Sequence, residues 1–267
     1  MRLFIITMDD PVQTKAFIKH IIDHRQKSIV GLAVTKGNRL TIGKKKSKIT
    51  YIFSLLLIMG LPAFFKNSCI TLTYKMKKKL SQVGITKNPS ITEYAKSKGI
   101  HIFSIKTLNS SSFREKLKNL NIDIIINQSQ NIIRKELLEI PKIGIINRHN
   151  ALLPKNRGRL SPFWVLYNQD KATGVSIHFV EEDIDSGDII VQKKYKVSAK
   201  DNFNTLVKKN YEIAPSAMLE ALDKLERSDT DFLPNDDVSA TYNSTPQFKH
   251  AWLYRKRRIL NFIKLVN

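Results

Sequence analysis

Cysteine is almost absent from this sequence: Cys69 is the only one in 267 residues. A single cysteine cannot form a disulfide within the chain, and no Cys/His cluster has the spacing of a zinc site. A reducing compartment, most simply the cytoplasm, is therefore expected. The opening stretch MRLFIITMDD has an apolar run too short for a secretory signal and meets two acids at once, so no signal peptide is expected.

Long apolar runs are scarce too, although residues 49–65, ITYIFSLLLIMGLPAFF, contain no charge. A membrane-spanning helix needs about 20 apolar residues, and Gly60 with Pro62 would break a shorter one. The segment 36–79 around this run is rich in lysine. Three interpretations stay open: a spanning helix, an interfacial segment held by apolar contacts and by lysines on anionic lipid, or a helical insertion packed on the domain or beside an acceptor site.

Acidic residues are half as frequent as basic ones, 23 against 45, which gives a net charge of +22. This charge would attract nucleic acid, anionic lipid or phosphate-rich small substrates. A lysine-rich surface without a dedicated basic patch is the alternative. Apolar content of 42% and charged content of 25% indicate a globular protein, and the length fits one domain with appendages.

The order of predicted elements indicates an α/β fold. Residues 2–8 read as a strand, 12–24 as a helix and 28–35 as a second strand, which implies a parallel crossover unit. The first connection, TMDDP, contains no glycine and so argues against a phosphate-cradling loop. Further strands are expected at 100–105, 122–127, 173–180 and 188–197, and further helices at 90–98, 112–120, 134–140, 162–168 and 203–225. The β-branched run 122–127 predicts a central strand.

The most informative stretch is Ile143–Gly158, IGIINRHNALLPKNRG. If its apolar run is a strand, Asn147 and His149 project from the same face at the carboxyl end, where open α/β sheets bind ligands. An amide donor beside an imidazole suits a carbonyl oxygen that gains negative charge. Asp185, in EEDIDSGDII, can supply a carboxylate. Polar residues at a strand end are more often capping or loop partners, so this pair alone decides little.

A longer match strengthens the case. The segments NRHNALLPKNRG, TGVSIHF (173–179) and DIDSGDIIVQ (183–192) closely resemble the folate-dependent formyltransferase family. The family has an N-x-H motif followed by an S-L-L-P-like loop, then a strand, then a D-x-G-D/P turn. The resemblance extends over about 122–225. It implies a Rossmann-like, mostly parallel sheet with helices on both faces, a catalytic domain at 1–225 carrying the basic and apolar helical insertion at 36–79, and a short C-terminal extension at 226–267.

The resemblance also implies a reaction and a site. Members transfer a formyl group from 10-formyltetrahydrofolate to a primary amine, with no metal. Asn147, His149 and Asp185 match the catalytic positions, with His149 kept protonated by Asp185. The loop after strand 122–127 would hold the folate mostly through its main chain. The expected folate-binding residues are Ser129, Gln130, Asn131, Ile132, Ile133, Asp183 and Gly187, and Gly187 is expected to permit a tight turn.

Arg148 departs from the family pattern, which has an aliphatic residue there. It should face away from Asn147 and His149, either buried against a carboxylate or reaching a phosphate of the acceptor. The basic loop with Lys155, Arg157 and Arg159 resembles the one that lies near the acceptor in methionyl-tRNA formyltransferase. His178 lies in the strand 173–180, and no chemistry is assigned to it.

A nucleotide-linked amino sugar, as used in surface polysaccharide synthesis, is the expected acceptor. Glycinamide ribonucleotide is disfavoured because the first loop lacks glycine. Methionyl-tRNA is the alternative that the positive charge supports, although the 42 residues after Leu225 are too few for the C-terminal barrel of the tRNA enzymes. An alternative of another class is a non-catalytic formyltransferase-like protein that binds RNA or a membrane surface.

Overall fold

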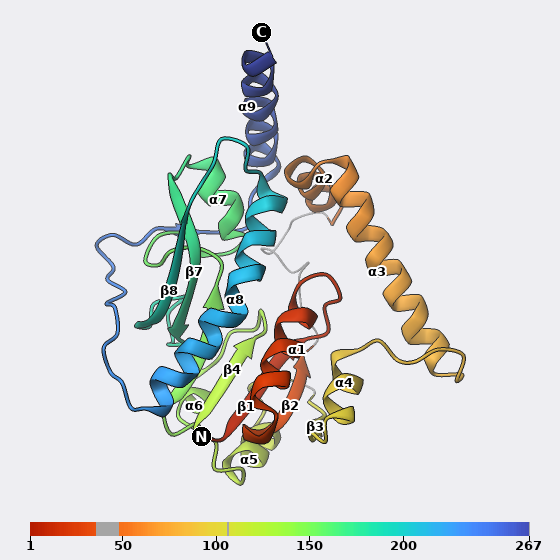
Figure 1. The fold of residues 1–267 in the computed structure, drawn as a ribbon, viewed down its shortest axis with the longest axis vertical. Coiled ribbons are helices and arrows are strands. Elements are labelled where there is room, and N and C mark those ends of the chain that lie inside the picture. Colours follow the sequence, from red (N-terminus) through yellow and green to blue (C-terminus); the bar gives the residue numbers. More distant parts are fainter. Residues whose placement is uncertain (36–47, 106, 267) are drawn as a thin grey trace.

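A seven-stranded sheet forms the centre of the protein (Figure 1). The computed structural model describes residues 1–35, 48–105 and 107–266. The strands lie in the order β3-β2-β1-β4-β5-β7-β8, with parallel pairing from β3 to β5 and antiparallel pairing at β7 and β8. The predicted α/β fold with a mostly parallel sheet is therefore confirmed. Their bounds are β1 (Leu3–Met8), β2 (Ile29–Thr35), β3 (Ile102–Phe103), β4 (Ile124–Gln128), β5 (Gly144–His149), β7 (Ala172–Phe179) and β8 (Ile189–Lys196).

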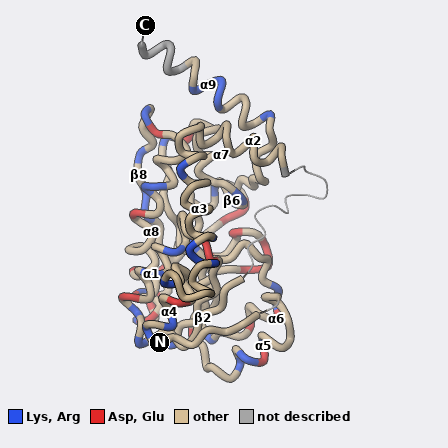
Figure 2. Tube along the Cα trace, turned by 90° about the vertical axis from the view of Figure 1, so that its right-hand side faces the viewer, with Lys and Arg blue, Asp and Glu red and all other residues tan. Residues whose placement is uncertain are grey.

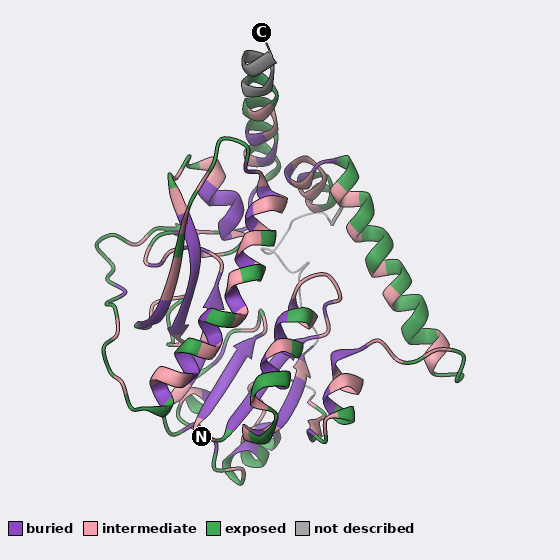
Figure 3. Ribbon diagram, in the orientation of Figure 1, coloured by how far each residue is buried: buried purple, intermediate pink, exposed green. Residues whose placement is uncertain are grey.

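Helices cover both faces of the sheet because its inner strands alternate apolar side chains between two cores. On β1, Leu3 and Ile5 pack with α1, α4 and α8, whereas Phe4 and Ile6 pack with α5 and α6. Burying each such side chain contributes about 1.5–3 kcal/mol. Figure 3 shows the resulting buried strands between exposed helix faces. The helix bounds are α1 (Thr14–Arg25), α4 (Ile91–Ser97), α5 (Ser111–Lys118), α6 (Lys135–Leu138), α7 (Ser161–Tyr167) and α8 (Phe203–Glu226).

Several predicted boundaries were wrong at short elements. The strand expected at 100–105 is only two residues long. The helix expected at 112–120 begins at Ser111, after the cap position Ser110, and α7 follows Leu160, which adopts left-handed backbone angles. The hydroxyl of Ser161, at the start of α7, lies 3.1 Å from Nε2 of His149.

The insertion forms two helices, α2 (Lys48–Met59) and α3 (Leu61–Ser81), and part of its expected range, 36–47, lies outside the described residues. The chain turns between them at Gly60, whose φ of 81° favours glycine, and Pro62 sits in the first turn of α3. Within the described residues, no helix combines the length and apolarity that crossing a bilayer requires. α2 packs beside α9 (Phe248–Val266), which extends from the body (Figure 1). A short strand, β9 (Tyr242–Asn243), pairs with β6 (Arg157–Gly158).

The cap of α8 gives a stability prediction. The side chain of Asn202 accepts hydrogen bonds from the backbone nitrogens of Asn204 and Thr205 at 2.9 and 3.1 Å. We expect Asn202→Ala to lower the free energy of unfolding by about 1 kcal/mol, because it removes an acceptor from two orphan donors. Urea denaturation followed by circular dichroism measures this. Ser110→Ala, at a cap position that makes no side-chain capping bond, is the control. An equal loss in both variants would contradict the prediction.

Candidate active site

The end of β5 divides three consecutive polar residues between the two faces of the sheet. Arg148 points into the layer formed by α1 and α8, where its guanidinium stacks between the rings of Phe17 and Tyr211. Side chains alternate along a strand, so Asn147 and His149 share the opposite face. The sequence predicted this division. All three residues lie at the carboxyl edge of the parallel strands, as expected for a ligand site in an open α/β sheet.

His149 is buried and both of its ring nitrogens face oxygen atoms. Its Nδ1 lies 3.2 Å from Oδ2 of Asp185, and its Nε2 lies 2.8 Å from the backbone oxygen of Asn156. A ring protonated on both nitrogens donates to the carboxylate and to the carbonyl at once. A neutral ring would leave one of these oxygens facing a lone pair. Oγ of Ser161 also lies 3.1 Å from Nε2, so the two ring nitrogens face three oxygen atoms in all.

Asp185 is held in this position by the backbone of its turn and by a hydrogen bond from Gly158. Its backbone adopts a φ of 52°, and the backbone nitrogen of Gly158 donates to its Oδ2 at 2.8 Å. Burial opposes ionisation of Asp185. The facing charge and hydrogen bond of His149 outweigh that effect and hold the pKa of this carboxyl well below its usual value. Asp185 therefore rests as a carboxylate near neutral pH.

Gly187 has a different role from the one expected. The positive backbone angle of the turn belongs to Asp185, whereas a Cβ atom at Gly187 would lie 2.4 Å from the backbone oxygen of Phe179. Glycine is therefore required here by close packing of two backbone segments. Asn235, from the segment after α8, donates to the backbone oxygens of both Asp185 and Gly187 at 2.8 Å. The segment after α8 thus fixes the backbone of the turn that carries Asp185.

A second histidine faces the same carboxylate. His178 stands opposite Asn147 in the antiparallel pairing of β5 and β7, and its Nε2 lies 3.6 Å from Oδ1 of Asp185. Its Nδ1 lies 2.6 Å from the backbone oxygen of Phe179, which marks that nitrogen as the protonated one. Burial lowers the pKa of His178 to about 4. We therefore describe His178 as a neutral imidazole beside the carboxylate of Asp185.

Asn147 is half-buried and oriented by a neighbouring strand. Gln128, at the end of β4, donates from Nε2 to Oδ1 of Asn147 at 3.1 Å. The amide nitrogen of Asn147 makes no hydrogen bond within the described residues, so its two protons remain for a ligand. The structure shows no direct contact between Asn147 and the His149–Asp185 pair. They are linked through the cross-strand position of His178.

The loop expected to hold the folate follows β4 at the same edge of the sheet. Ser129 and Asn131 are half-buried, Gln130 and Ile132 are exposed, and Ile133 is buried in the core under α5 and α6. Asn109 fixes this loop, because its side chain donates to the backbone oxygen of Ile132 and accepts from the backbone nitrogen of Arg134. The buried Oδ1 of Asn131 has no hydrogen-bond partner within the described chain. Asp183 is exposed on the opposing turn.

Two arginines lie elsewhere than expected. Arg148 donates to the hydroxyl of Tyr211 at 2.7 Å, and within the described residues it forms no ion pair with a carboxylate. Arg157 is fully buried and bonds Asn235, Asp237 and Tyr242, so it holds the C-terminal segment instead of contacting an acceptor. Of the predicted basic loop, the exposed Lys155 and Arg159 remain available.

Neither Gln128 nor Asn235 was predicted from the sequence, and His178 was named there without a role. Gln128 directly follows a predicted central strand, which is a weak signal for the edge of the sheet. The alternation in 173–180 placed His178 on the face opposite Val175 and Ile177, but gave no partner. Asn235 has no sequence signal, because 50 residues separate it from Asp185.

The low pKa of His178 predicts a pH dependence of stability. An unfolded histidine has an ordinary pKa of 6.5, against about 4 in the folded chain. Between these values the unfolded chain binds the additional proton, so stability is complete above pH 6.5 and falls as the pH approaches 4. The loss for one such group is about 3 kcal/mol.

We expect His178→Gln to flatten the decline in free energy of unfolding between pH 6.5 and 4. Urea denaturation at several pH values in this window measures it. The control is His101→Gln, which removes an exposed histidine and should retain the slope. A decline of the same steepness in His178→Gln and in the unmodified protein would contradict the assignment.

Comparison with known proteins assigns the sequence to one family. The family model described as "Formyl transferase" matches residues 65–222. The match begins at Phe65, inside the segment 36–79. The methionyl-tRNA formyltransferase of Kosmotoga olearia is 31% identical over 201 residues, covering 70% of this chain and 64% of that protein. The chain spans 58% of the corresponding Fusobacterium nucleatum protein.

Solved structures share the fold. The phosphoribosylglycinamide formyltransferase of Bacillus halodurans has a TM-score of 0.57 at 20% identity, covering 84% of this chain and 95% of that one. The N-formyltransferase of Helicobacter canadensis, in complex with folinic acid and dTDP-3-aminofucose, has a TM-score of 0.57 at 15% identity, covering 97% of this chain and 80% of that one. At these identities the likeness shows the fold. With the family model matching more than half of its length, the chain belongs to the formyl transferase family.

Proposed function

We propose that the protein transfers a formyl group from 10-formyltetrahydrofolate to a primary amine. The observation that carries this proposal is the buried pair of His149 and Asp185, 3.2 Å apart, on the same face as the free amide of Asn147. Family membership supports it, and so does the folinic acid in the Helicobacter canadensis structure. The single cysteine, exposed at Cys69, is consistent with a cytoplasmic enzyme.

In the proposed reaction, the amine nitrogen attacks the formyl carbon and forms a tetrahedral intermediate with a negative oxygen. The amide nitrogen of Asn147 donates a hydrogen bond to that oxygen, and the charge of His149 stabilises it through space. The carboxylate of Asp185 accepts the proton released by the amine, through a water molecule. The bond between the formyl carbon and N10 of the folate then breaks, and N10 takes up a proton.

We propose that the folate lies along the loop Ser129–Ile133, between β4 and the turn that carries Asp183 and Gly187. Asn109 already fixes part of the main chain of this loop, which leaves the pteridine a preformed set of backbone groups. The unpartnered Oδ1 of Asn131 supports a polar ligand at this position. The catalytic unit is proposed to be 1–225, with 226–267 closing the site through Asn235.

A nucleotide-linked amino sugar for surface polysaccharide synthesis is the proposed acceptor. The Helicobacter canadensis structure holds dTDP-3-aminofucose and aligns with 97% of this chain. Lys155 and Arg159 are exposed beside the site and suit the phosphates of such a compound. Methionyl-tRNA is the second candidate, because the relatives aligned by sequence are methionyl-tRNA formyltransferases and the net charge is +22.

The proposed oxyanion donor is tested by Asn147→Ala. We expect the turnover number to fall by about 10²–10³-fold with a small change in KM, because the lost bond forms only in the transition state. The measurement is steady-state formylation with 10-formyltetrahydrofolate. Glu182→Gln, an exposed change in the turn before Asp185, is the control and should keep full activity. Unchanged turnover in Asn147→Ala would remove Asn147 from the mechanism.

The two acceptors are separated by direct competition. We expect the purified protein to formylate a nucleotide-linked amino sugar, detected by mass spectrometry, at a higher kcat/KM than charged initiator tRNA. Exclusive formylation of the tRNA would replace the first candidate with the second. Folate binding without a formylated product from either amine would contradict the proposed reaction and favour a non-catalytic, RNA- or membrane-binding protein.

A further inference from the structure

Two long segments of the chain contain no acidic residue. Asp and Glu are absent from His24 to Thr92 and again after Asp237. The fold brings these segments together, because α2 packs against α9. Ile58 of α2 shares a buried cluster with Tyr254 of α9. The helices α2 and α9 therefore lie together at one end of the molecule, and α3 descends from there along the side of the body (Figure 1). None of these three helices carries an acidic residue, whereas Figure 2 shows mixed charges over the body.

α3 exposes apolar side chains along one side. None of its residues, all of which the structure describes, is buried (Figure 3). The exposed fractions of Phe65, Leu72 and Met76 are 60%, 69% and 55%. With 100° per residue, positions 61, 65, 69, 72 and 76 fall on a single stripe. We call this set the apolar stripe of α3: Leu61, Phe65, Cys69, Leu72 and Met76.

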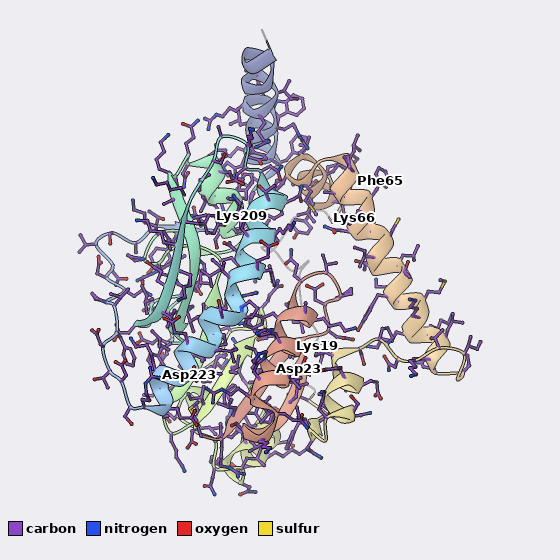
Figure 4. The ribbon with its side chains drawn as sticks, viewed as in Figure 1. Lys19, Asp23, Phe65, Lys66, Lys209 and Asp223 are labelled. Atoms are coloured by element: carbon purple, nitrogen blue, oxygen red, sulfur yellow. The ribbon has the colours of Figure 1, made fainter. Side chains whose placement is uncertain are left out.

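The opposite side of α3 is the side attached to the body. Tyr74 lies half a turn from the apolar stripe and donates a hydrogen bond to Asp9, in the loop after β1. Lys78, on the same side as Tyr74, pairs with the other oxygen of Asp9 at 2.5 Å. The attachment turns the apolar stripe outward. Figure 4 shows Phe65 and Lys66 near the start of α3, away from the sheet.

Lysines border the apolar stripe. With 100° per residue, Lys79 falls at one edge of the apolar stripe with Leu61, and Lys75 lies about 40° beyond that edge. Lys66 and Lys77 lie about 60° and 80° beyond the opposite edge. These four lysines are exposed and form no ion pair within the described residues. A helix with an apolar stripe flanked by lysines is typical of the interface between water and anionic lipid. Arg255–Arg258 of α9 add positive charge at the same end of the molecule.

We propose that α3 docks the protein on an anionic lipid surface, with the apolar stripe in the acyl boundary and the lysines on the headgroups. A second copy of the chain is a poor occupant, since two such surfaces would bring lysines against lysines. RNA would use the lysines but gains nothing from exposed Leu61, Leu72 and Met76. This proposal does not depend on the formyl transfer reaction, and its tests measure binding alone.

Vesicle sedimentation of the full chain tests the docking. We expect binding to vesicles of phosphatidylcholine with phosphatidylglycerol and far weaker binding to pure phosphatidylcholine. Replacing Lys75, Lys77 and Lys79 with Gln removes lysines that make no ion pair and leaves Lys78 on Asp9. Each lysine near an anionic surface strengthens binding by roughly fivefold, so the triple variant should bind about a hundredfold more weakly. The control is Lys194→Gln, Lys196→Gln and Lys200→Gln, an equal charge change on and after β8.

The apolar contribution is tested by Phe65→Ser with Leu72→Ser. We expect this double variant to lose vesicle binding by at least tenfold while keeping its circular dichroism spectrum, since both side chains are exposed. Val238→Ser, at a position that is 98% exposed, is the apolar control and should bind as the unmodified protein does.

Cys69 provides a direct reading because it lies in the apolar stripe and is the only cysteine of the chain. A polarity-sensitive dye attached there should become brighter and shift to shorter wavelength on anionic vesicles, and respond to lipids that carry a quencher in their acyl chains. An unchanged signal would overturn the proposal. Equal losses of vesicle binding in the two triple-lysine variants would also overturn it. So would binding of bulk RNA by the protein with an affinity that Phe65→Ser with Leu72→Ser leaves unaltered.

Discussion

The buried contact between the ring of His149 and the carboxylate of Asp185 is the interaction on which the proposed site depends. A carboxylate and an imidazolium removed from water lose several kcal/mol of hydration each, and their attraction repays this only when the remaining polar atoms are also bonded. The structure meets that condition from three directions. Gly158 donates to the carboxylate, the backbone of Asn156 accepts from the ring, and Asn235 holds the turn that presents Asp185.

The topology of the sheet explains why these groups meet. β5 is the last strand of the parallel series, and β7 pairs with it in the antiparallel direction, so the chain leaving β7 returns to the neighbourhood of the carboxyl edge of β5. The turn with Asp185 follows β7 and therefore reaches His149. The pairing also sets His178 opposite Asn147, which adds a neutral imidazole to one side of the carboxylate. Because His178 is neutral, it adds no positive charge beside the carboxylate of Asp185.

The contact that attaches α3 to the body lies at the same edge of the sheet as the proposed site. Asp9, which receives Tyr74 and Lys78, lies in the loop after β1, at the same edge of the sheet as the ends of β4 and β5. A protein resting on lipid through α3 would thus hold its sheet edge near that surface. None of the helices α2, α3 and α9 carries an acidic residue, and α2 packs beside α9.

The sequence by itself determined the fold class, the central strand and the side of β5 from which Asn147 and His149 project. Period-two burial on strands and ordered motifs are local signals, and they need no knowledge of distant neighbours. The helix break at Gly60 followed from local chemistry for the same reason. Only the tertiary structure decided the roles of Arg148, Arg157, Gly187 and Asn235. Each depends on a partner far away in the chain: Tyr211 for Arg148, Asp237 for Arg157, Phe179 for Gly187 and Asp185 for Asn235. A buried guanidinium or a close backbone contact leaves no periodic pattern in the sequence. Its partner is defined only once the two segments are packed together.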